Sequence, residues 1–218
     1  MRGLMIEYDY LAVFFALNVI AYLIVHIPLG VRSILSDTKP AVRKQTSLKE
    51  FYTPLKFSLV FPIIVLTTVY FFIIFLFWPF YHLLFGSEFM GGWLLELPYS
   101  TSFQLIGMLV ITAATIVNIL GRIARGKSYI SDGVPDELST GSGHKVVRHP
   151  LYASYCYYFV GFQFVFQSYL TLPLLLGVFA YYSASKHEEK VLEREFGEEY
   201  REYQKKVGML LPFVGRRK

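Results

Sequence analysis

Five apolar stretches separated by polar segments dominate the chain. Residues 8–29, 57–76 and 103–120 are long and almost free of charge, and two shorter runs, residues 151–166 and 170–182, follow a polar stretch. A helix needs about 20 apolar residues to cross a bilayer. The long stretches therefore predict membrane spans, and the short pair predicts a tight helical hairpin. We expect an all-α polytopic membrane protein with about five transmembrane helices.

A sixth, amphipathic helix is predicted after the hairpin. Apolar residues recur there at spacings of three and four, which marks one face of a helix. Gly197 interrupts this pattern midway. The simplest interpretation is a cytoplasmic C-terminal helix on the lipid headgroups, with two tyrosines as anchors. The apolar face consists of Val191, Leu192, Phe196, Tyr200, Tyr203 and Val207.

Composition supports the membrane assignment. Hydrophobic residues make up 54% of the chain and charged residues 17%, whereas soluble domains carry about 25% charged residues. The mean hydropathy is +0.43. The single cysteine, Cys156, forms no internal disulfide and builds no thiolate metal cage. These values exclude a disordered chain and a disulfide scaffold, and we expect no metal site.

The basic residues follow a membrane topology. In a five-span arrangement, 20 of the 21 lysine and arginine residues fall on one side. The positive-inside rule then places the N-terminus outside and the tail in the cytoplasm. A four-span or six-span arrangement would scatter these charges. The net charge of +5 is thus explained by the membrane, and no nucleic-acid partner is expected.

The cytoplasmic segments divide the chain into two regions. Residues 1–120 form a three-span region, and residues 121–218 carry the polar stretches. Residues 121–152 are rich in glycine, which predicts a loop. Pro150 fits the first turn of the fourth span. Arg148 and His149 then lie at a helix N-terminus, whose dipole and free N–H groups attract anions.

Two neighbouring glutamates are predicted to lie at the same level of the membrane as Arg148 and His149. Glu188 and Glu189 follow the fifth span directly. Because the last two spans are predicted to be antiparallel neighbours, these acids should lie beside Arg148 and His149. Such a group of charges suits a zwitterion, whose carboxylate would meet the cations and whose ammonium or hydroxyl groups would meet the acids.

The same residues carry a family resemblance. The segment Arg148-His149-Pro150-Leu151-Tyr152 is followed, after the hairpin, by Glu188-Glu189 and by Phe196-Gly197-Glu198-Glu199-Tyr200. This pattern resembles the isoprenylcysteine carboxyl methyltransferase family and, more loosely, the phospholipid methyltransferases. The similarity covers roughly residues 121–212. It implies an integral-membrane enzyme that uses S-adenosylmethionine.

The resemblance also implies which residues serve the reaction. It places the cofactor beside the start of the fourth span, the loop before it and the paired glutamates. If the resemblance holds, the candidate catalytic residues are His149, Glu189 and Arg201. The implied cofactor-binding residues are Gly126, Lys127, Tyr129, His144, Val146, Arg148, His149, Pro150, Tyr152, Glu188 and Glu189.

Two positions depart from the family pattern. Ser142-Gly143-His144 stands where the family often has Gly-Pro-Tyr, and Ser154 replaces a usual glycine. An alternative alignment matches Gly143-His144-Lys145-Val146-Val147 to a His-x-Leu-Val segment that comes earlier in the family pattern, with a deletion after it. The role of His144 depends on this choice.

The sequence does not identify the acceptor of the methyl group. An amphiphilic acceptor is expected, with its apolar tail between the helices. The carboxylate of an isoprenylcysteine-like compound needs no base, whereas a lipid amine or small thiol would require one, with His149 or Glu189 as candidates. Arg201 would position an acceptor carboxylate or, alternatively, pair with a neighbouring glutamate. The rival classes are an NADPH-dependent sterol or isoprenoid reductase and a non-enzymatic membrane protein.

Overall fold

The computed structural model describes residues 6–35, 58–86, 94–95, 100–125 and 138–214. Regular structure within these residues is helical, apart from two isolated β-bridges. The all-α fold class is therefore confirmed. The helices are α1 (Tyr8–Leu35), α3 (Val60–Phe85), α4 (Ser100–Arg125), the 3₁₀ helix η3 (Ser142–Lys145), α5 (Pro150–Phe166), α6 (Leu174–Phe196) and α7 (Glu198–Lys206).

Within the described residues, three helices are long and apolar enough to cross a membrane: α1, α3 and α4. The α1 and α4 helices extend beyond the stretches that hydropathy predicted, whereas α3 begins three residues after its predicted start and continues to Phe85. Pro79 lies inside α3 without ending it. The α5 helix has only 17 residues, and the second half of α6 is charged. The predicted total of five spans, and the orientation of the chain, therefore stay predictions.

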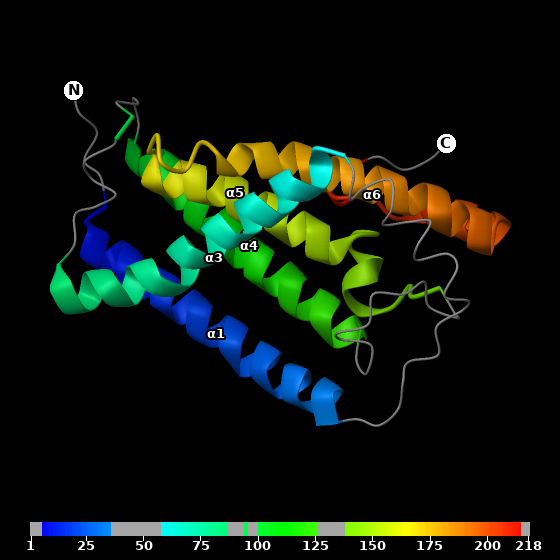
Figure 1. The fold of residues 1–218 in the computed structure, drawn as a ribbon, viewed down its shortest axis with the longest axis horizontal. Helices are drawn as coiled ribbons and strands as arrows, with labels where there is room; N and C mark the ends of the chain where they lie inside the picture. Colours follow the sequence, from blue (N-terminus) through cyan, green and yellow to red (C-terminus); the bar gives the residue numbers. More distant parts are fainter. Residues whose placement is uncertain (1–5, 36–57, 87–93, 96–99, 126–137, 215–218) are drawn as a thin grey trace.

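The five long helices pack into one bundle, and Figure 1 shows α1 on one side of it and α6 on the opposite side. The main contacts between the helices follow the closed order α1, α4, α5, α6, α3 and back to α1, and we call this closed arrangement the ring. The α5 helix is the most enclosed of them, because 11 of its 17 residues are buried. A helix covered by protein on several faces exposes little surface to lipid, which explains how a short α5 fits into this bundle.

Aromatic side chains fill the middle of the ring. Phe71 of α3 is 1% exposed and packs its ring against Phe162 of α5 at a centroid distance of 5.3 Å. Phe15 of α1 stacks on Phe166 at 5.2 Å and 10°. Burying each such side chain contributes about 1.5–3 kcal/mol, so these contacts hold α1, α3 and α5 together.

Polar contacts close the end of the ring at which α5 turns into α6. Gln167, in the left-handed conformation with φ of 45°, ends α5, and its amide donates to the carbonyl of Ser100 at 2.8 Å. Gln104 donates to the carbonyl of Val165 at 3.3 Å and accepts a hydrogen bond from Ile6 N at 2.7 Å. These bonds fix α4, α5 and the start of the chain at a common level.

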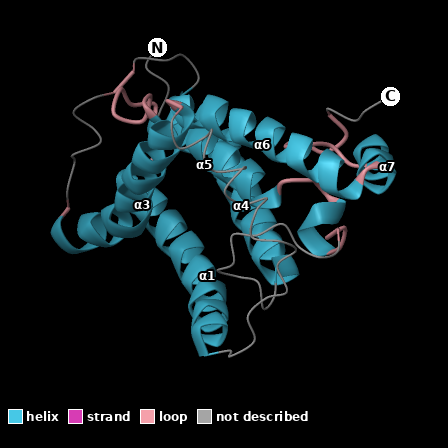
Figure 2. Ribbon diagram, turned by 45° about the vertical axis from the view of Figure 1, so that its right-hand side comes forward, coloured by secondary structure: helices cyan, strands magenta, loops and turns pink. Residues whose placement is uncertain are grey.

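The predicted amphipathic tail helix differs from what the structure contains. The α6 helix starts at Leu174 and continues without a break through the predicted span and into the tail, ending at Phe196. Gly197 has φ of 54° and ψ of −122°, a conformation that only glycine adopts easily. It therefore separates α6 from α7, and Figure 2 shows α7 turned away from the line of α6.

Glycine at the contact of α4 and α5 gives a test of the packing. A Cβ atom added to Gly107 would lie 2.8 Å from the carbonyl oxygen of Gly161 and from Val165 N. Both are backbone atoms that move only with the helix. We expect Gly107→Ala to lower stability by about 1–3 kcal/mol, measured by thermal unfolding in detergent. Gly141→Ala is the control, because no atom lies within 4 Å of its added Cβ; equal stability of the two variants would contradict this packing.

Candidate functional site

A buried ion pair joins the start of α5 to α6. Arg148 Nε donates to Glu189 Oε1 at 2.7 Å, and Arg148 Nη2 lies 2.5 Å from the same oxygen. The Arg148 side chain is 3% exposed and that of Glu189 is 16% exposed. Burial opposes the charge of Glu189, but the hydrogen bonds and charges of His149 and Arg148 outweigh it and lower the pKa of this carboxyl.

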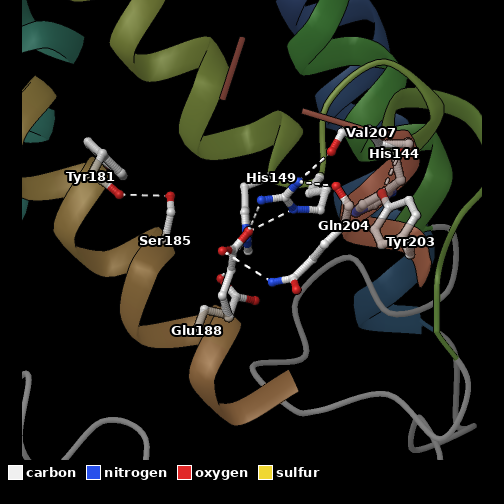
Figure 3. A network of polar contacts seen from close by, with 10 residues as sticks. His144, His149, Tyr181, Ser185, Glu188, Tyr203, Gln204 and Val207 are labelled. Carbon is white, nitrogen blue, oxygen red and sulfur yellow. Dashed lines mark hydrogen bonds and ion pairs between the residues drawn. The ribbon is translucent and has the colours of Figure 1, made fainter. Parts of the chain in front are cut away.

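His149 lies between the two glutamates. Its Nδ1 is 3.4 Å from Glu188 Oε2, and its Nε2 is 3.6 Å from Glu189 Oε1. Burial disfavours the charged ring, yet the two carboxylates together raise the pKa of His149 to about 9. The imidazole therefore carries a positive charge at neutral pH and balances the second acid. Figure 3 shows His149 facing the helix that carries Glu188.

The tail after α7 covers this group of charges. Arg148 Nη1 donates to the carbonyl of Gln204 at 3.3 Å and to that of Val207. The backbone N–H groups of Arg148 and His149 donate to Gly208 and Met209. Sequence reasoning expected free N–H donors before α5; the donors of these two residues are instead used by the tail.

Close backbone contact positions the loop before α5. A Cβ atom on Gly143 would lie 2.9 Å from Gly121 N, and one on Gly121 would lie 3.0 Å from Pro150 Cβ. Side chains at these glycines would push η3 away from α4 and from the start of α5. The hydroxyl of Tyr203 in α7 adds a second contact, since it donates to the carbonyl of His144 at 2.5 Å.

The structure brings together six residues that the resemblance implied. Pro150 begins α5, as expected, and Tyr152 stacks on His149 with ring centroids 5.8 Å apart at 8°. The six are Arg148, His149, Pro150, Tyr152, Glu188 and Glu189.

The remaining implied residues have other positions. His144 and Val146 lie at the end of η3, where Val146 is 39% exposed. Arg201 pairs with Glu198 at 3.2 Å and is half exposed, so the structure contains the alternative contact for Arg201. Gly126, Lys127 and Tyr129 lie outside the described residues.

Sequence reasoning missed two polar residues beside the ion pair. Gln204 donates to Glu189 Oε2 at 3.4 Å, although its sequence position suggested the solvated face of a tail helix. Tyr200 is 1% exposed, and its hydroxyl has no hydrogen-bond partner among the described residues. Burial, with the nearby charge of Glu189, raises the pKa of Tyr200. The spacing of Tyr200 and Tyr203 was the available signal, but it pointed equally well to a lipid interface.

The charge on His149 predicts a pH-dependent stability. The folded pKa of about 9 is above the ordinary value of 6.5, so the stabilisation is complete below pH 6.5 and is lost as the pH rises through 9. We expect the free energy of unfolding to fall by about 3 kcal/mol across that window, followed by circular dichroism in detergent. His149→Phe should lack the decline, and Glu188→Gln should move it to lower pH. A decline of the same size in His149→Phe would contradict this assignment.

Comparison with known proteins relates this chain to methyltransferases. No family model matches the chain. It is 41% identical over 80 residues to a methanethiol S-methyltransferase from Pseudomonas deceptionensis, covering 34% of this chain and 28% of that protein. It is 28% identical over 116 residues to a probable protein-S-isoprenylcysteine O-methyltransferase from Oryza sativa subsp. indica, covering 50% and 61%. The chain thus spans less than two thirds of these relatives, and it is similar to methyltransferases that include isoprenylcysteine O-methyltransferases.

Proposed function

We propose that this protein is an integral-membrane methyltransferase that uses S-adenosylmethionine and acts on an amphiphilic acceptor. The observation that carries the proposal is the buried group of Arg148, His149, Glu188 and Glu189, assembled from the start of α5 and from α6. The methyltransferase relatives support the reaction class.

The residues fit the polar part of this cofactor. One buried polar atom beside the ion pair, the Tyr200 hydroxyl, has no hydrogen-bond partner among the described residues, and the contact of His149 Nε2 with Glu189 Oε1 is long, at 3.6 Å. Arg148 and His149 would hold the carboxylate of the cofactor's amino acid, and Glu188 would meet its ammonium or ribose hydroxyls. When bound, the cofactor supplies an activated methyl group on a sulfonium.

The protein then has to align the cofactor with the acceptor and to enclose both of them. Methyl transfer from a sulfonium has a neutral leaving group, so the protein need not supply an acid. Positioning of the two reactants supplies about 7–11 kcal/mol in favourable cases. The tail around Val207 and Gly208 covers the polar group on one side and excludes water from it.

The charges favour an acceptor that is already ionised. His149 is protonated at neutral pH, and the pKa of Glu189 is lowered, so neither is a strong base. A carboxylate acceptor, as in an isoprenylcysteine-like compound, needs none. A thiol acceptor is the second candidate, favoured by the similarity to the methanethiol S-methyltransferase.

Cofactor binding tests the proposal directly. We expect calorimetric titration of the detergent-solubilised protein to detect S-adenosylhomocysteine, with a loss of affinity of about tenfold or more in Glu189→Gln and His149→Ala, because each change removes a charge from the group. Glu188→Gln covers the case in which Glu189→Gln fails to fold. Glu202→Gln is the control, since Glu202 pairs only with Lys205 at the surface in the described structure. Binding of NADPH without S-adenosylhomocysteine would favour the reductase and overturn the proposal.

The chemistry of the product identifies the acceptor. We expect radiolabelled methyl groups to enter an S-prenylated cysteine and to be released as methanol by mild base, because base hydrolyses a methyl ester. A methylated thiol or amine keeps its label under the same treatment. Stable label on methanethiol, with none on the prenylated acid, would select the thiol acceptor instead.

A further inference from the structure

An exposed apolar turn, which we call the tail turn (residues 210–214), follows the segment that covers the candidate site. Its side chains Leu211, Phe213 and Val214 are 50%, 76% and 58% exposed. An apolar surface of this kind marks a contact with a partner or a membrane. By contrast, Tyr200 and Tyr203, which the sequence suggested as lipid anchors, are 1% and 8% exposed. The tail turn is therefore a different surface from the predicted one.

The backbone holds the tail turn in a fixed shape. Val214 N donates to the carbonyl of Leu211 at 3.3 Å, and Met209 N donates to the carbonyl of Val214 at 3.2 Å. Gly208 packs so closely that an added Cβ atom would collide with the carbonyl oxygen of Leu211. Phe213 has φ of 65°, which is uncommon for a bulky residue. The apolar side chains thus point outward because of a closed backbone turn.

The tail turn lies beside the apolar part of the bundle. The hydroxyl of Tyr157 donates to the carbonyl of Leu210, and Tyr157 lies two turns, about 10 Å, beyond the start of α5. The next residue, Tyr158, donates to Thr115 of α4 at 3.0 Å. Thr115 lies well inside the stretch of α4 that is long and apolar enough to cross a membrane, Ser100–Ala124. The end of the chain, red in Figure 1, therefore returns from α7 to the level of the apolar helices.

Exposed lysines lie on both chain segments that adjoin the tail turn. Lys206 is the last residue of α7, two positions before Gly208. Lys145 ends η3, two positions before Val147, which forms a parallel bridge with Gly208. Three further basic residues, at positions 216–218, follow in the sequence and lie outside the described residues. An apolar surface with basic neighbours is the combination that binds an anionic membrane.

We infer that the tail turn inserts into the membrane leaflet next to the candidate site, with anionic phospholipids as its partner. Phe213 and Val214 enter the apolar region, and the lysines meet the lipid phosphates. The turn continues directly from the carbonyls that bind the N–H groups of Arg148 and His149. Lipid contact therefore stabilises the cover over the ion pair. The inference goes beyond the proposed function and does not rest on it, since it concerns the chain and the lipid alone.

A spin label measures the depth of the tail turn. In a Cys156→Ala background, labels are attached at Phe213→Cys and, for comparison, at Glu202→Cys, where the native side chain is 50% exposed on α7. In nanodiscs of phosphatidylcholine with phosphatidylglycerol, we expect oxygen to reach the label at position 213 more readily than a water-soluble nickel chelate does. The label at position 202 should show the opposite order. Preferential access of the nickel chelate at position 213 would overturn the inference.

Backbone hydrogen exchange reports on the cover itself. The peptide that contains Arg148 and His149 carries the two N–H groups that donate to the tail. In the same nanodiscs, we expect Phe213→Ser to speed their exchange about tenfold, measured by mass spectrometry, because the contact of an aromatic side chain with lipid is lost. Phe213→Leu should restore the protection, since the side chain stays apolar. Phe179→Ser is the matched control, because Phe179 is 72% exposed but belongs to α6.

Lipid composition distinguishes membrane contact from a purely structural role of the turn. In nanodiscs of phosphatidylcholine alone, we expect the protection of the same N–H groups to fall about tenfold, because the lysines lose the anionic headgroups. Equal exchange in the two lipid mixtures, or equal acceleration in Phe213→Ser and Phe179→Ser, would contradict the inference. Neither measurement uses the cofactor, so titration of S-adenosylhomocysteine tests the proposed function separately.

Discussion

The candidate site depends on one buried contact, the ion pair of Arg148 and Glu189. Removing one partner of a buried pair costs about 3–5 kcal/mol, because the other charge is left in an apolar environment. Here the same guanidinium also binds carbonyls of Gln204 and Val207. A single side chain therefore joins the start of α5, the body of α6 and the tail after α7. The geometry of the other charged groups follows from this junction.

The ring of helices has two different interiors. Phenylalanine rings fill its middle, where Phe71, Phe75 and Phe162 are almost completely buried. Toward the ion pair, tyrosine and histidine side chains take their place, and the buried Tyr200 hydroxyl has no hydrogen-bond partner among the described residues. Dense apolar packing provides rigidity, whereas the polar end holds the buried charges of the candidate site.

Hydropathy predicted the helices better than their ends, because apolar runs mark burial or lipid contact but not where a helix stops. The end of α6 depends on the backbone conformation of Gly197. In the sequence, the glycine itself was the signal for this end. The meeting of Arg148 with Glu189 followed from the antiparallel hairpin, which residue order reveals. The contact of the tail with His149 could not be predicted from residue order. It uses the backbone carbonyls of Gly208 and Met209, which every residue has whatever its side chain.

The bonds between the tail and the loop have a consequence for biosynthesis. Residues that the ribosome adds after α7, including Gly208 and Met209, accept hydrogen bonds from the backbone immediately before α5. A nascent chain whose long helices have all been inserted still lacks these carbonyls. The tail therefore does not yet cover Arg148 and His149. The ring of helices is therefore able to assemble before the tail covers the candidate site, because chains begin to fold from the N-terminal side during synthesis.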